Sequence, residues 1–136
     1  MMTLVCLWAA LGLAQVDAEP ADDVAALGVE IRSLIEDTGA AKDGGAESLA
    51  ARCGLVAEAA DDADTRLAAR LMQAQAYYAS ALDAIAQSSA GRASMRLVQL
   101  RSAANAARRV NAPEAKLAGD GWLLLADLVD TRRNAR

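Results

Sequence analysis

The sequence predicts an all-α protein: a single domain of four to five antiparallel helices packed as a helical bundle. The composition is 54% hydrophobic but only 3% aromatic, and Ala alone makes up about a quarter of the residues. Ala has the highest intrinsic helix propensity, whereas the β-branched and aromatic residues that favour strands are scarce. Apolar residues also recur at spacings of three and four between short breaks. We therefore expect helices nearly throughout, with a core of small side chains.

Residues 1–18 have the pattern of a secretory signal peptide. Met1 to Val16 carries no charged side chain, and the apolar block from Leu4 to Ala14 has the length of a signal-peptide core. Small or short residues at 16–18 suit a cleavage site, although no Lys or Arg precedes the apolar block. The run is shorter than the roughly 20 apolar residues of a membrane span. We predict an exported protein, periplasmic or extracellular, whose domain at 19–136 has no stable membrane span.

The first predicted helix begins at Pro20, which is favoured in a first turn, and Gly39 is its expected C-terminal cap. Its apolar face contains Val24, Leu27, Ile31, Leu34 and Ile35. After a break at 42–45, a second helix is expected from about Ala46 to Ala60. Its buried face contains Leu49, Cys53, Val56 or Ala57, and Ala60.

Cysteine content allows no disulfide within the mature chain, because Cys6 leaves with the signal peptide and Cys53 alone remains. We expect Cys53 to be a buried small hydrophobe. The alternative is an intermolecular disulfide or a reactive thiol.

The third predicted helix starts near Asp62, where three aspartates suit capping better than metal binding because the spacing of a calcium loop is missing. It reaches about Gln87. Its expected buried residues are Leu67, Leu71, Ala74, Tyr78, Ala81 or Leu82, and Ile85. Arg70 and Tyr77 lie at the edge of this face, and such a pair is common at protein interfaces.

The fourth helix is expected from Ser88 or Ser89 to Val110, and the fifth from Pro113 onward. The fourth buries Ala93, Leu97, Leu100, Ala104 and Ala107, and its other side carries Arg92, Arg96, Arg101, Asn105, Arg108 and Arg109 with no acid. The fifth is expected to bury Ala118, Trp122, Leu125, Leu128 and Val129.

An alternative architecture is a tetratricopeptide-like array of helical hairpins, whose units pair two helices in about 34 residues. The third helix alone is too long for that unit, and the landmark residues of those repeats do not fall in register. The sequence therefore favours a bundle.

Charge is unevenly distributed along a chain of net charge −4. Residues 19–64 contain 12 acidic and 3 basic side chains, whereas residues 65–136 contain 5 acidic and 11 basic ones. Either acidic early helices lie against basic late helices, or the basic side binds an anionic partner.

Catalytic residue types are scarce. The chain contains no His, which removes the commonest general base and the commonest transition-metal ligand. Zinc would need several Cys or His ligands, and no glycine-rich phosphate loop occurs. We predict a non-enzymatic protein without metal or cofactor.

The predicted function is that of an exported binding or scaffolding module acting through protein–protein contacts. Arg101, Asn105 and Arg108 recur at spacings of four and three, so their side chains share one stripe that suits carboxylate or phosphate groups. Arg70 and Tyr77 are the second candidate partner site. The expected partner is a protein or a second copy of the chain, an anionic partner is one alternative, and no nucleic acid is expected. Two alternatives stay open: an accessory region of a longer exported enzyme, and a structural homo-oligomer.

Overall fold

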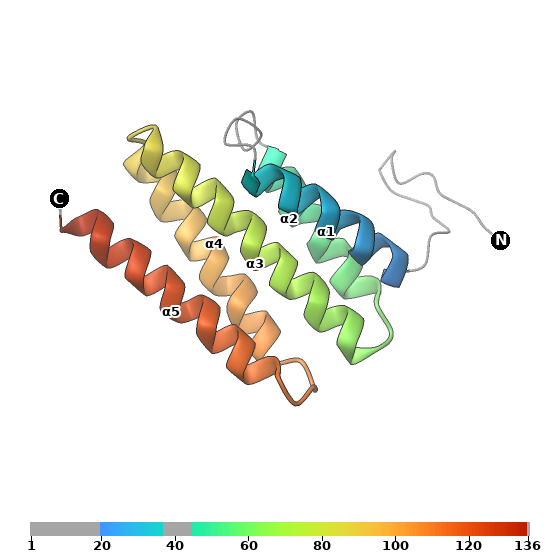
Figure 1. Ribbon diagram of the computed structural model, residues 1–136. Helices are drawn as coiled ribbons and strands as arrows, with labels where there is room; N and C mark the ends of the chain where they lie inside the picture. The colour runs from blue at the N-terminus through green and yellow to red at the C-terminus, as the bar shows by residue number, and fades with distance from the viewer. Residues whose placement is uncertain (1–19, 37–44, 136) are drawn as a thin grey trace.

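The structure, a computed structural model, describes residues 20–36 and 45–135 as five α-helices (Figure 1). The helices are α1 (Pro20–Glu36), α2 (Gly45–Ala59), α3 (Ala63–Ala86), α4 (Ala90–Arg108) and α5 (Ala115–Asn134). No strand occurs within these ranges, so the all-α prediction is confirmed. The predicted signal peptide at 1–18, the break at 42–44 and the expected cap Gly39 lie outside the described residues.

The helices pack as a bundle in which α3 is central and contacts each of the other four. In addition, α1 packs on α2 and α4 packs on α5, whereas the backbones of α2 and α4 do not pack on each other over the described ranges, and these two helices meet through the side chains of Glu47 and Arg96. Figure 1 shows α1 in front of α2 on one side of α3, and α5 in front of α4 on the other. The result is two layers, α1, α3 and α5 in one and α2 and α4 in the other. An array of hairpins would share this contact order, but α3 with its 24 residues exceeds half of a 34-residue unit.

Local chemistry at the helix termini explains where α3 and α4 begin. Asp62 is the N-cap of α3, as predicted, and its carboxylate accepts a hydrogen bond of 2.8 Å from the backbone N–H of Thr65. That hydrogen bond lowers the pKa of Asp62. Ser89 occupies the predicted N-cap position of α4, but its side chain makes no capping hydrogen bond. Ser88 before it has a positive φ of 59°, so the chain reverses tightly between α3 and α4.

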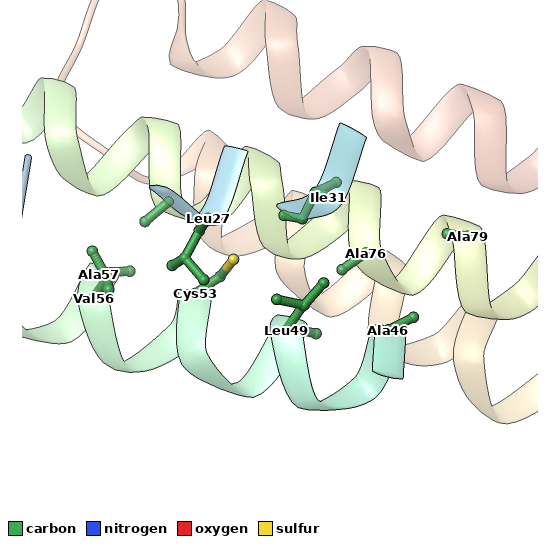
Figure 2. Close-up of a cluster of buried hydrophobic side chains, with 11 residues drawn as sticks. Leu27, Ile31, Ala46, Leu49, Cys53, Val56, Ala57, Ala76 and Ala79 are labelled. Atoms are coloured by element: carbon green, nitrogen blue, oxygen red, sulfur yellow. The ribbon is translucent and has the colours of Figure 1, made fainter. Parts of the chain in front are cut away.

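Two hydrophobic clusters on either side of α3 form most of the core. The first joins α1, α2 and α3, and in Figure 2 Leu27 of α1 is directed at Cys53 of α2. The second joins α3, α4 and α5 around Leu97 and Leu100, where Tyr78 and Trp122 meet edge to face with ring centroids 5.7 Å apart. Most other buried positions are Ala, which lets the helices approach closely.

Cys53 is buried in the first cluster as a free thiol, as the sequence predicted. Burial is the main reason that its pKa rises to about 12. The thiol is therefore neutral at physiological pH and acts as a small hydrophobe.

The buried face of α5 differs from the prediction. Leu128 was expected in the core but is 53% exposed, and Trp122 is only partly buried. The fully buried side of α5 carries small residues instead: Ala115, Gly119 and Ala126. Helix α4 comes so close that a Cβ atom at Gly119 would overlap the Arg108 side chain and lie 2.7 Å from the carbonyl oxygen of Ala104. The side of α5 that packs on α4 is therefore the one with small residues, which allow close approach, and not the one with the largest apolar side chains.

Gly119→Ala should lower the free energy of unfolding by about 1 to 2 kcal/mol, because the overlap with α4 outweighs the roughly 1 kcal/mol gain in helix propensity. Gly121→Ala is the matched control on the same helix, since nothing lies within 4 Å of its added Cβ atom. It should leave stability unchanged or raise it. Urea denaturation at low protein concentration measures both. Equal effects of the two substitutions would contradict the close contact at Gly119.

Candidate functional site

The predicted stripe on α4 faces α5. An Nη atom of Arg101 lies 2.9 Å from Asp127 and 3.3 Å from Asp130. Arg108 lies 2.6 Å from Asp120, with the orientation of an ion pair and not of an aligned hydrogen bond. Asn105, between them on α4, is half-buried. The two arginines of the stripe therefore form ion pairs within the chain.

Hydrogen bonds between α4 and α5 stabilise the ionised forms of Arg101 and Asp130. The hydrogen bond from Arg101 to Asp127 raises the pKa of the guanidinium further above its ordinary value. The pKa of Asp130 is lowered, first by its hydrogen bond from Arg133 and then by that from Arg101. Both shifts favour the charged forms of Arg101 and Asp130, which neutralise each other across α4 and α5.

A second polar cluster joins α2, α3 and α4. Ser80, which is fully buried, donates a hydrogen bond to the carboxylate of Glu47, and Arg96 Nε lies 3.1 Å from that same carboxylate. Arg96 also donates from an Nη atom to Gln99 Oε1 at 2.6 Å. Within the described ranges, Glu47–Arg96 is the one ion pair that joins the acidic 19–64 half to the basic 65–136 half. Within the described ranges, the acidic half and the basic half of the chain are therefore joined by little direct ion pairing.

A polar pocket of about 400 Å³ lies between α3 and α4 and adjoins this cluster through Gln99. Its lining includes the predicted pair Arg70 and Tyr77, which lie about two helical turns apart on α3. Its full lining is Arg70, Gln73, Tyr77, Gln99, Ser102, Ala103, Ala106 and Arg109. Arg101, Asn105 and Arg108 do not line it, so the two predicted sites lie at different places on the molecule.

The pocket is rich in hydrogen-bond donors and none of its lining residues is acidic. Arg70 Nη1 donates to Gln73 Oε1 at 3.1 Å, and Gln99 Oε1 accepts from Arg96. Each of these glutamines also carries an amide NH2 group, which can donate two hydrogen bonds. With the two guanidinium groups of Arg70 and Arg109, they form a site that favours an anion.

Sequence reasoning missed the contributions of α4 to this pocket. In the sequence Arg109 is only one of several arginines on the basic side of the fourth helix, and nothing distinguishes Gln99 or Ser102. They reach the pocket because α3 and α4 pack side by side, which places residues about thirty positions apart around one cavity.

The described helices contain neither a cluster of metal-binding side chains nor a membrane-spanning segment. Over residues 20–36 and 45–135, no group of three His, Cys, Asp or Glu side chains is close enough to bind a metal ion. None of the helices in these ranges has both the length and the apolar character needed to cross a bilayer.

Comparison of the chain with protein-family models, with curated proteins and with solved structures finds no match. The pocket between α3 and α4 is therefore interpreted from its own geometry and chemistry.

Proposed function

We propose that this chain is a non-enzymatic binding module that holds an acidic side chain of a partner protein in the pocket between α3 and α4. The observation that carries the proposal is the juxtaposition of Arg70 and Arg109 in a cavity with no acidic lining residue. A guanidinium group recognises a carboxylate through two parallel N–H donors, and such charge-assisted hydrogen bonds are stronger than neutral ones. Elsewhere on α4 the arginines are already paired with acids of the chain.

The dimensions of the pocket favour a side chain over a large cofactor. Its volume of about 400 Å³ is near the lower end of the range for small-molecule sites, roughly 300 to 1,000 Å³. A single Asp or Glu side chain with its neighbouring backbone fits that space, and Tyr77 adds an apolar ring with a hydroxyl group, which is typical of protein interfaces.

Binding is favoured over catalysis because the whole sequence lacks His, the usual general base. We further propose that the module acts outside the cytoplasm, as the signal-peptide pattern at 1–18 predicts.

Fluorescent octapeptides that each contain one Asp or Glu, and matched peptides with Asn or Gln in its place, test the proposal by fluorescence anisotropy. Acidic peptides that fit the site should bind the wild-type protein, and their amide counterparts should bind more weakly. Arg70→Gln combined with Arg109→Gln should weaken binding by at least about tenfold, since each charged hydrogen bond contributes roughly 1.5 to 3 kcal/mol.

The matched control is Arg32→Gln combined with Lys116→Gln, which removes the same charge from two exposed positions outside the pocket. It should leave binding within about twofold of wild type at moderate salt. Failure of every acidic peptide to bind, or equal weakening by the two double variants, would contradict the proposal.

A further inference from the structure

The outward side of α5 carries an apolar stripe that no other helix of the described structure covers. This α5 stripe consists of Leu117, Gly121, Leu124 and Leu128, and its three leucines are 78%, 62% and 53% exposed. At 100° per residue, the stripe lies opposite the fully buried side formed by Ala115, Gly119 and Ala126. Helix α5 uses its small-residue side against α4, so its large apolar side chains face away from the bundle.

The spacing of the α5 stripe is that of a helix pair. Its residues are separated by four, three and four positions, the a/d pattern by which two helices pack along a shared seam. The separations of four, three and four positions are the same when the helix is read in the opposite direction. In an antiparallel pair, Leu117 faces Leu128 of a second copy, and Gly121 faces Leu124 of a second copy. Nothing lies within 4 Å of the Cβ position of Gly121, so an incoming leucine has room there.

Charges beside the stripe complement one another in the same register. Glu114, the residue directly before α5, and Arg132 of α5 lie on one flank of the stripe. Both are exposed, and neither has an ion-pair partner within residues 20–36 and 45–135. The antiparallel arrangement places Glu114 near Arg132 of a second copy, and it does so twice by symmetry.

The opposite flank carries acids that would otherwise repel. Asp120 and Asp127 are already paired with Arg108 and Arg101 of α4, so their charges are neutralised within each copy. Both flanks therefore permit the antiparallel pairing, and one of them favours it.

We infer that two copies of this chain associate through antiparallel packing of the α5 stripe on itself, with a two-fold axis between Gly121 and Leu124. A single helix pair buries an area at the low end of specific interfaces, below about 1,200 Å², so the dimer forms reversibly. The α5 stripe contains none of the residues that line the pocket between α3 and α4, so this inference does not depend on the proposed function.

Sedimentation velocity over a wide range of protein concentration tests the association. The wild-type chain should convert from monomer to dimer as concentration rises, and Leu124→Glu should raise the dissociation constant at least about tenfold by burying a charge. Val98→Glu is the matched control, because Val98 is equally exposed but lies on α4. A wild-type protein that stays monomeric up to millimolar concentration, or a dimer that Val98→Glu disrupts as strongly, would overturn the inference.

Cysteine cross-linking tests the register with side chains that leave the fold intact. Mild oxidation of an equal mixture of Leu117→Cys and Leu128→Cys should give mainly the mixed disulfide between positions 117 and 128. Cys53 is buried and does not compete. Predominant disulfides between two copies of the same variant would indicate a parallel or unrelated arrangement and would overturn the antiparallel register.

Discussion

Leu100→Ala is expected to lower the free energy of unfolding by about 3 to 4 kcal/mol, within the range for removal of a fully buried leucine. Leu100 and Leu97 are the two large side chains among the fully buried members of the cluster between α3, α4 and α5. The buried neighbours of Leu100 there are chiefly alanines: Ala74, Ala81, Ala103 and Ala126. Alanines have no rotamers with which to fill the space, so the cavity should persist and the cost should lie above the simple transfer term.

Leu55→Ala is the control, since Leu55 is an exposed leucine within a helix and its replacement changes helix propensity by the same amount. It should alter stability by less than about 0.5 kcal/mol. Urea denaturation followed by circular dichroism measures both variants. A loss below about 1.5 kcal/mol for Leu100→Ala would show that the helices close around the vacated space.

The helices could be predicted because their signals are local. Pro20, Asp62 and Ser89 mark the starts of α1, α3 and α4 within a few residues of the predicted positions. The apolar face of α4 was also predicted correctly, since its five predicted residues, spaced four and three positions apart, are all buried. Local propensity and capping thus determine most of the secondary structure in this Ala-rich sequence.

The orientation of α5 could not be predicted in this way. Hydrophobic periodicity assigns the core to the largest apolar side chains and so selected Leu128, yet α4 contacts Gly119. Two helices that meet through small residues gain close contact along their whole length. That gain depends on the opposing surface of α4, which the sequence of α5 does not contain.

The candidate site was only half predictable for a related reason. Arg70 and Tyr77 share one helix, so the sequence identifies them as a pair, whereas Arg109 follows the end of α4. Conversely, Arg101 and Arg108 form a stripe on α4 with no acid on the same helix, and their partners are on α5. A basic helix face in the sequence indicates where donors lie but not whether another helix already supplies the carboxylates.

Glu47→Ala is expected to lower the free energy of unfolding by about 2 to 3 kcal/mol, because it removes the carboxylate that joins α2 to Ser80 of α3 and Arg96 of α4. The side chains of Arg96 and Glu47 are only 16% and 23% exposed, so water only partly replaces the lost partner. The cost of breaking a fully buried pair, about 3 to 5 kcal/mol, is the upper limit.

Glu30→Ala provides the comparison, since Glu30 also pairs with an arginine of the adjacent helix but both side chains are nearly half exposed. It should cost less than about 1 kcal/mol, as is usual for surface ion pairs. Urea denaturation of both variants gives the difference, and equal losses would mean that burial does not strengthen the Glu47 contact.

Replacing both charged residues distinguishes two contributions to the free energy of unfolding: the stabilisation by the ion pair itself, and the destabilisation caused by leaving one partly buried charge unpaired. Glu47→Leu combined with Arg96→Met keeps much of the side-chain volume, and it should recover most of the stability that Glu47→Ala loses. Such recovery would mean that the contact mainly fixes how α2 and α4 sit on α3, since its net contribution to stability is small. If the double variant is instead as unstable as Glu47→Ala, the ion pair itself stabilises the fold, in addition to the apolar packing of α2 on α3.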